Sequence, residues 1–552
     1  MVAALAGAAF LALALSVLAF GYPHEDAYIL FKYARHVGAG LGSVFSPGGP
    51  HAEGATDFLW MLALGGGARL GVDPAIAAAV LNALGFALVV WRTHALVRRA
   101  SPASSGVVTM VVASLLLVHP FSAAGALGFS ATLYAAVALE LYAALQSGAL
   151  VRVPWLALLL GLLRPDGVVL GGTAAAIALV RASSAERPVR ARVFRDAGIA
   201  FVVASAYFVL RYRYFGSVLP LPLIVKSHFE GRAPGIAETL DWGASTALPT
   251  IGMLLGFRLL LGPLGVFASS SRMHLVALAP PIVHVLAFAP SFPSQNVAGR
   301  FQSPDALVLY LFALTVGLAA ATTARRRALV VAGFAAATYF QGFVGVRAIG
   351  EAFAKDYVNP FSVSLGRIAR TRAESGAPPL RVASTEAGRV LYWTSGPVLD
   401  LVGLNSPETA AVPPSRAVLA RFDPDVVMFH HASGFDEDAM ERGHEGASVF
   451  RIDGPLARYV RPWNARFLAP DLPPYDVLHV DNVRAAPIAT AAFLDDRSAT
   501  YELWAARFVA RFARFHVYAI RADLPEKQAI VRALESAHEP ARHGSHLAAL
   551  KE

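Results

Sequence analysis

The stretch Tyr22-Pro23-His24-Glu25-Asp26-Ala27-Tyr28 follows the first apolar run of the chain, Val2 to Phe20. Two adjacent carboxylates, preceded by a histidine, therefore stand where the chain leaves a hydrophobic segment. No basic segment precedes the apolar run, and no convincing small-residue cleavage site follows it. We therefore expect a retained signal anchor and not a cleaved signal peptide. The acidic stretch is predicted to lie beside a membrane surface.

The composition is that of a membrane protein. The chain has 552 residues, of which 56% are hydrophobic and 15% are charged, and its mean hydropathy is +0.52. Soluble domains carry about 25% charged residues. The apolar runs predict a mostly α, polytopic membrane protein with about 11 transmembrane helices, several of them short for a bilayer core of about 30 Å.

The net charge of +9 is explained by loop arginines on one side of the membrane, which predicts lipids and not nucleic acid as the partner. No nucleic-acid-binding motif accompanies that charge. The chain contains no cysteine, so disulfides, thiolate nucleophiles and Cys-based metal sites are excluded.

The basic residues predict the orientation of the chain. With a cytoplasmic amino terminus and a juxtamembrane segment at 58–70 that does not cross, most loop arginines fall inside. These include Arg98, Arg99, Arg152, Arg181, Arg325, Arg326 and Arg327. The same assignment places the first loop, 21–57, and the carboxyl-terminal region outside. We therefore predict a transmembrane domain over 1–346 and an extracytoplasmic domain over 347–552.

The carboxyl-terminal region changes in composition, because charges become frequent and the apolar runs become short. Residues 381–385 and 425–429 have the pattern of buried strands, and residues 501–515 are interpreted as helical. The region is long enough for one soluble α/β domain.

Glu25 and Asp26 are the first candidates for chemistry. A carboxylate can take the proton of an attacking hydroxyl, and repulsion between adjacent acids can raise the pKa of one of them. Acids at this position can equally cap the amphipathic helix that follows, and the two roles are compatible. A metal role for His24, Glu25 and Asp26 lacks a second ligand cluster. The sequence therefore indicates no metal site and no certain cofactor, although it does not exclude the use of a divalent metal.

Three further groups carry charge at predicted membrane edges. Lys226, beyond a Pro-rich turn, and Arg300, at the mouth of a helix, could bind a phosphate, or could serve as interfacial anchors. Arg164 and Asp166 interrupt an apolar run, and we interpret them as a loop in which the two charges neutralise one another.

The order of these pieces resembles the GT-C superfamily of polyprenyl-phosphate-sugar-dependent glycosyltransferases, and within it the mycobacterial terminal arabinofuranosyltransferase family. The first-loop matches are Glu25-Asp26-Ala27-Tyr28-Ile29, Lys32-Tyr33-Ala34, Val44-Phe45-Ser46-Pro47-Gly48, Glu53-Gly54, Thr56 and Leu59-Trp60. Later matches are Arg164-Pro165-Asp166-Gly167, Leu219-Pro220 with Lys226, Arg300-Phe301-Gln302, and Asp400 to Asn405. The chain departs from the family's Gly-Leu-Glu-Thr pattern at Gly128-Phe129-Ser130-Ala131.

The resemblance implies an inverting transfer of a sugar, with arabinofuranose as one candidate, from a polyprenyl-phosphate donor to a glycan or lipid acceptor. It implies a bacterial inner-membrane enzyme that acts at the outer face. Asp26 is the first choice for the base and Glu25 the second. The substrate-binding candidates are His24, Lys32, Glu53, Lys226, Arg300, Asp400 and Asn405. A non-catalytic glycan- or lipid-binding membrane protein, or a transporter, is the alternative.

Overall fold

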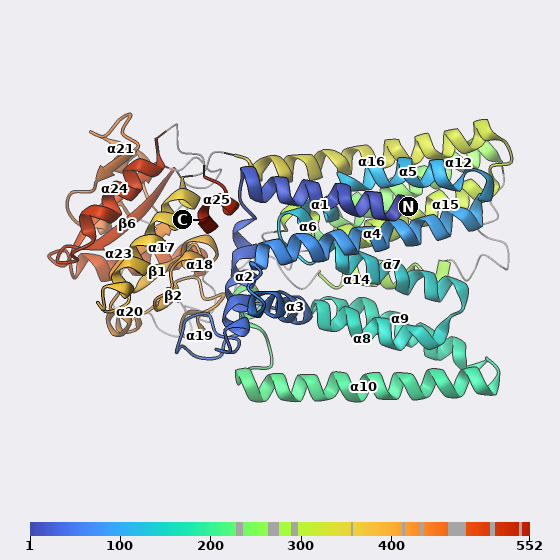
Figure 1. Ribbon diagram of the computed structural model, residues 1–552, viewed down its shortest axis with the longest axis horizontal. Coiled ribbons are helices and arrows are strands. Elements are labelled where there is room, and N and C mark those ends of the chain that lie inside the picture. The colour runs from blue at the N-terminus through green and yellow to red at the C-terminus, as the bar shows by residue number, and fades with distance from the viewer. Residues whose placement is uncertain are drawn as a thin grey trace.

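A computed structural model describes residues 1–227, 236–262, 275–288, 296–354, 357–410, 414–430, 435–461, 482–507, 514–539 and 544–551. Figure 1 shows a bundle of long helices at one end and a domain built on a β-sheet at the other. The bundle contains the amino terminus, and the carboxyl terminus lies in the sheet domain.

Five helices of the described residues are long and apolar enough to cross a membrane, and there are up to seven spans if each of two bent pairs counts as one. The five are α1 (Val2–Phe20), α4 (Pro74–Ala100), α10 (Arg187–Phe215), Thr239–Leu261 within α12 (Ile236–Leu261), and α15 (Ser303–Ala320). The bent pairs are Pro102–Leu117 with α6 (Pro120–Ala126), and Ala324–Tyr339 with Gln341–Ala352, both within α16 (Ala324–Ala352). The chain is an integral membrane protein on this ground.

The predicted count of about 11 spans is higher because it included short apolar runs. In the structure, some of these runs form helices of fewer than 18 residues, such as α8 (Val153–Leu163) and α9 (Gly167–Ser183). The 11 residues of α8 reach only about 17 Å at 1.5 Å per residue. The segment predicted to be juxtamembrane forms α3 (Phe58–Arg69), which at 12 residues is also too short to span alone. The remaining bundle helices are α5 (Ser105–Leu117), α7 (Ala131–Ser147), α11 (Leu221–Ser227) and α14 (Ala279–Leu286).

The acidic stretch begins α2 (Glu25–Gly38), which lies across the end of the bundle beside the sheet domain (Figure 1). His24 caps this helix, because its Nδ1 accepts a hydrogen bond of 3.1 Å from the backbone N–H of Asp26. Both acids occupy the first turn, where the helix dipole favours negative charge. Tyr28, Phe31 and Tyr33 are fully buried, so α2 is packed by bundle and sheet domain together.

The described residues of the sheet domain form six strands in the order β2-β1-β3-β6-β5-β4. β1 runs parallel to β2 and β3, and the other pairs are antiparallel. The strands are β1 (Val382–Ser384), β2 (Val398–Asp400), β3 (Val426–His430), β4 (Val449–Arg451), β5 (Tyr501–Arg507) and β6 (Phe515–Arg521). The longer helices of the domain are α17 (Val358–Glu374), α20 (Arg416–Phe422), α23 (Asn482–Asp495) and α24 (Lys527–Ala537).

Alternate residues of β3 face two separate cores. Val426 and Met428 belong to the large core that continues into the bundle, whereas Val427 and Phe429 belong to a second core within the sheet domain. The protein is thus a mostly helical membrane protein with a carboxyl-terminal mixed α/β domain. The predicted boundary at 346/347 stays a prediction, and α16 continues past it to Ala352.

The two predicted strands are confirmed as β1 and β3, but the helical interpretation of 501–515 is wrong. Residues 501–507 form β5, and residue 515 begins β6. Tyr501, Leu503 and Ala505 are buried, while Glu502 and Trp504 are half-buried. This period of two belongs to a strand, and it was hidden by the arginines and alanines around it.

Polar contacts hold α2 to the sheet domain. Lys32 Nζ donates to the carbonyl oxygens of Leu391 and, at 3.1 Å, Thr394, around the end of α18 (Arg389–Trp393). His546 of α25 (His546–Lys551) forms hydrogen bonds with the side chains of Tyr28 and Asp73, each at 3.0 Å. These buried polar side chains are partnered across the two regions, as buried polar groups require.

The turn after β2 is built on the carboxylate of Asp400. It accepts hydrogen bonds from the backbone N–H groups of Val402, Gly403 and Asn405 and from the Asn405 side chain, at 2.9–3.2 Å. Burial raises the pKa of Asp400 to about 6, although these donors oppose that rise. Asp400 and Asn405 therefore shape the turn, while Asn405 Oδ1 is buried without a hydrogen-bond partner among the described residues.

We predict that Asp400→Ala destabilises the protein by about 2–4 kcal/mol, because four buried N–H bonds lose their acceptor. Thermal denaturation in detergent should show a lower melting temperature. Asp453→Ala, at an exposed position of the same domain, is the control and should leave the melting temperature unchanged. Equal melting curves for the two variants would contradict the structural role.

Candidate functional site

A cavity of about 130 Å³ lies where α2, the end of the first loop and three bundle connections meet. Its lining is mixed polar and apolar. The lining residues are Asp26, Ile29, Leu30, Gly54, Thr56, Asp57, Phe129, Ser130, Arg164, Pro222, Arg300, Phe301 and Leu404. Two carboxylates and two guanidinium groups thus share one small space.

Asp26 and Arg300 form an ion pair inside this cavity. Arg300 Nη2 lies 3.1 Å from Asp26 Oδ2, and both side chains are largely buried. The guanidinium also lies over the ring of Phe129, 4.0 Å from its centroid, a placement that favours a cation. Arg300 Nη1 is buried and has no hydrogen-bond partner among the described residues. The arginine therefore holds the aspartate through one terminal nitrogen and leaves the other without a hydrogen-bond partner among the described residues.

Glu25 does not line the cavity, although its carboxyl is hydrogen-bonded to that of Asp26. Its Oε1 accepts a hydrogen bond of 2.5 Å from the backbone N–H of Gly388 in the sheet domain, and it is not among the residues that line the cavity. Burial raises the pKa of Glu25 well above its usual range, and the nearby carboxylates of Glu386 and Asp26 raise it further. The two adjacent acids thus have different surroundings.

Asp57 is a second cavity carboxylate that the sequence did not single out. Its Oδ2 accepts a hydrogen bond of 2.6 Å from Ser130, at the position where the chain departs from the family pattern. Burial raises the pKa of Asp57, and the nearby Arg164 opposes that rise. The sequence feature that could have identified Asp57 is its position at the end of the first loop, directly before an apolar helix.

Arg164 links the cavity to a series of ionisable side chains inside the bundle. It pairs with Asp166 at 2.6 Å, which confirms the predicted neutralisation across the turn. Its Nη1 donates to the carbonyl oxygen of Arg300 at 3.0 Å. Beneath them, His284 lies 3.3 Å from Asp166 and 2.7 Å from Asp305. Arg164 therefore positions Arg300, although the sequence favoured a purely structural loop.

The other candidates lie outside this cavity. His24 caps α2, and Lys32 serves the contact with α18, where burial lowers its pKa to about 7. Glu53 accepts from Arg211 Nε at 2.7 Å in a buried ion pair. The side chain of Lys226 lies outside the described part of the chain, but Pro222 on the same helix, α11, lines the cavity.

Asp400 and Asn405 stand behind the cavity wall. Their turn includes Leu404, which lines the cavity, and it approaches Gly54 so closely that a Cβ there would lie 1.9 Å from Asn405 Oδ1. Asp26, Arg300 and Pro222 thus meet at one place, while Asp400 and Asn405 support it.

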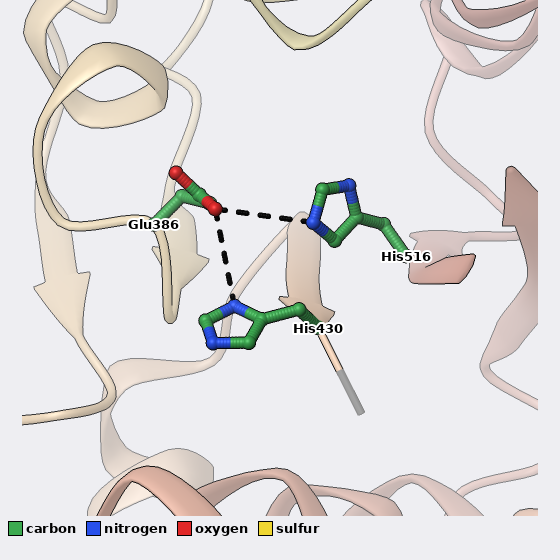
Figure 2. Close-up of side chains that lie close together, drawn as sticks. All are labelled: Glu386, His430 and His516. Carbon is green, nitrogen blue, oxygen red and sulfur yellow. Dashed lines mark ion pairs between the residues drawn. The ribbon is translucent and has the colours of Figure 1, made fainter. Parts of the chain in front are cut away.

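Three side chains that could hold a metal ion lie elsewhere, in the sheet domain. Figure 2 shows Glu386 pointing toward His430 and His516, and the three ligand atoms lie within 4.8 Å of one another. Glu386 comes just after β1, whereas the histidines stand on β3 and β6. No sequence spacing joins these positions, so only the fold brings them together.

Comparisons with known proteins agree with the architecture. A solved structure of ArnT from Cupriavidus metallidurans in the apo state matches with a TM-score of 0.51 and 14% identity, and the match covers 81% of this chain and 95% of that chain. At this identity the likeness shows the fold alone. The molecule is therefore an integral membrane protein with a GT-C-like fold.

Two other solved structures are similar at lower scores. ArnT from the same organism bound to undecaprenyl phosphate has a TM-score of 0.49 at 14% identity, over 81% of this chain and 95% of that chain. The arabinofuranosyltransferase AftD from Mycobacteria has a TM-score of 0.47 at 14% identity, over 82% of this chain and 37% of that chain. Residues 352–516 match a family described as a domain of unknown function, DUF8728. No curated protein sequence matches the chain.

The cap of α2 predicts a pH dependence of stability. Burial lowers the pKa of His24 to about 4, and the Asp26 carboxylate only partly opposes this. The unfolded chain, with a histidine pKa of about 6.5, binds the proton first as the pH falls. The contribution of neutral His24 is therefore complete above pH 6.5 and is lost between pH 6.5 and 4.

We expect the melting temperature of the wild type to fall more steeply over this range than that of His24→Asn. Asparagine keeps a capping oxygen but does not titrate. Melting curves measured in detergent at several pH values test this. Parallel pH profiles for the two proteins would contradict the role given to His24.

Proposed function

We propose that the protein is a glycosyltransferase that moves a sugar from a polyprenyl-phosphate donor to a hydroxyl acceptor at the outer membrane face. The observation that carries the proposal is the cavity itself. It combines a buried carboxylate, Asp26, with two buried arginines, Arg164 and Arg300, at the bundle end beside the sheet domain. A base and cations beside one another are what transfer from a phosphate leaving group requires.

Asp26 is the proposed base. Its carboxylate takes the proton of the acceptor hydroxyl while that oxygen forms a bond to the anomeric carbon. The bond from the anomeric carbon to the phosphate oxygen breaks, and the polyprenyl phosphate leaves with the electron pair. Attack opposite the leaving group inverts the anomeric configuration. Arg300 would stabilise the departing phosphate, because its Nη1 is buried without a hydrogen-bond partner among the described residues.

The surroundings of the two acids favour Asp26 over Glu25. Asp26 lines the cavity, whereas Glu25 accepts from Gly388 at 2.5 Å. Glu25 is better suited to positioning the first turn of α2 against the sheet domain. Asp57 is a second cavity carboxylate, and its bond to Ser130 suits it to binding a sugar hydroxyl.

The phosphate end of the donor has a further candidate ligand in Lys226. Its helix α11 contributes Pro222 to the cavity wall, and Lys226 follows four residues later on that helix. Lys226 would then bind the phosphate together with Arg300.

The prenyl chain needs an apolar path that reaches this cavity. A groove of about 310 Å³ runs between α8, α9 and α10, with an almost wholly apolar lining that includes Gly161, Leu162 and Ala204. Leu162 lies two positions before Arg164, which lines the cavity. We therefore place the first isoprene units in this groove. Arabinofuranose remains one candidate sugar, and a cell-envelope glycan or a lipid remains the candidate acceptor.

We predict that Asp26→Asn lowers turnover by about 10²–10⁴-fold, because a general base contributes on that order. Transfer should be measured in membranes with a panel of polyprenyl-phosphate sugars, including a polyprenyl-phosphate arabinofuranose. Glu25→Gln should have a smaller effect, since an amide oxygen still accepts from Gly388.

The control is Asp453→Asn, which changes an exposed acid of the sheet domain and should keep full turnover. Each variant must be shown to be folded at the assay temperature before rates are compared. If folded Asp26→Asn turns over at the wild-type rate, Asp26 is not the base. If wild-type protein consumes no donor from the panel but binds it, a non-catalytic lipid-binding role replaces the proposal.

The groove yields a separate prediction. Ala204→Trp should fill it and raise the KM for a long-chain donor about ten-fold, which corresponds to about 1.4 kcal/mol of lost binding. The KM for a donor whose phosphate carries no isoprene unit should not change. Val203→Trp is the matched control, because Val203 is 42% exposed on the outer side of α10. An equal effect of both substitutions would exclude the groove as the chain path.

A further inference from the structure

The group formed by Glu386, His430 and His516 is placed by the sheet. β1 and β3 are parallel neighbours, so Glu386 and His430 follow or end their strands at the same edge. His516 is paired directly with His430 across the antiparallel β3–β6 ladder. The three side chains therefore converge from three adjacent parts of one rigid sheet (Figure 2).

The distances suit a small divalent cation. Glu386 Oε1 lies 3.9 Å from His430 Nδ1 and 3.8 Å from His516 Nε2. Tetrahedral ligands about 2.0–2.1 Å from zinc are about 3.3–3.4 Å apart, so small side-chain rotations bring the three atoms to coordination distance. Two imidazoles and one carboxylate form a donor set that zinc accepts, with a fourth position left for water.

Residues that hydrogen-bond to the proposed ligands orient two of the three. Tyr357 Oη lies 2.6 Å from His516 Nδ1, which leaves Nε2, the nitrogen that faces Glu386, to coordinate. Arg389 Nε lies 3.3 Å from Glu386 Oε2, so Oε1 is the oxygen turned toward the histidines.

The third ligand, His430, must give up one hydrogen bond before its Nδ1 can bind a metal ion. Its Nδ1 lies 2.9 Å from Thr385 Oγ1, and this contact is replaced when the nitrogen binds a metal. The Thr385 hydroxyl keeps a second bond, because it accepts from the backbone N–H of His430 at 3.1 Å. The cost of exchanging this one contact is small beside three metal–ligand bonds.

The group adjoins the first turn of α2. Glu386 lies two residues before Gly388, whose N–H binds Glu25. A Cβ at Gly388 would lie only 2.0 Å from the Glu25 carbonyl oxygen, so the turn that follows β1 fits tightly against the acid pair. A cation held by Glu386 would fix this turn and would also offset the repulsion between the carboxylates of Glu386 and Glu25.

We propose that Glu386, His430 and His516 bind one Zn²⁺ ion, which fastens the 385–389 turn of the sheet domain against the first turn of α2. The ion is structural and lies behind the acid pair, not in the cavity. The site does not depend on the proposed transfer reaction, since its ligands and its geometry belong to the sheet domain.

The test measures metal content and stability on the full-length protein in detergent. The protein is purified through a histidine-free affinity tag, stripped with a chelator, dialysed against Zn²⁺ and analysed by mass spectrometry for metal. We expect about one zinc per chain and a higher melting temperature with zinc than without, as linkage requires for an ion that binds only the folded state. X-ray absorption at the zinc edge should report two imidazole ligands.

The variants are chosen so that folding and binding can be separated. Glu386→Gln and His430→Gln, both at half-buried positions, should each lose the stoichiometric zinc and the thermal shift. Tyr357→Phe keeps the ligands but removes the outer partner, and should weaken zinc affinity about 10-fold or more. His444→Gln, a histidine of the same domain that stacks on Phe450, is the control.

A wild-type protein that retains no zinc overturns the proposal, and so does Glu386→Gln with wild-type zinc content. Equal zinc loss in His444→Gln would assign the metal to adventitious surface binding and would also overturn it. Zinc bound as expected by a protein that transfers no sugar would leave the metal site standing and refute the proposed reaction alone.

Discussion

The candidate site depends on the compensation of charges that are buried at one end of a helical bundle. Asp26 is held by Arg300, and the carbonyl of Arg300 is held by Arg164, which pairs with Asp166. Breaking one partner of a buried pair leaves an uncompensated charge, which costs far more than the pair contributes. The first loop and the connections before α9 and α15 must therefore keep one mutual arrangement.

The sheet domain completes that arrangement and is not merely appended to the bundle. Lys32 and His546 bridge it to α2, and Gly388 binds Glu25 directly. Because α2 is buried between the two regions, its acids are fixed from both sides. One acid is turned to the cavity and its neighbour to the sheet domain, so adjacent residues acquire different chemistry from different surroundings.

Much of the fold was accessible from the sequence because hydrophobic patterning is local. The membrane character, the two adjacent strands β1 and β3 and the mixed α/β tail were predicted from apolar runs and their lengths. The number of spans was not, since a short apolar run can become a bent pair or a short helix, depending on what packs beside it. The strand β5 was mistaken for a helix because its alternation is masked by alanine and arginine.

The sequence by itself determined that the chain enters a membrane and that an acidic pair begins an amphipathic helix, because composition and periodicity act over neighbouring residues. Only the tertiary structure decided which side chains meet. It paired Asp26 with Arg300, brought Asp57 into the cavity, engaged Lys32 and Glu53 in contacts outside the cavity, and gathered Glu386 with two histidines. These contacts join positions up to hundreds of residues apart, and no local pattern encodes such distances.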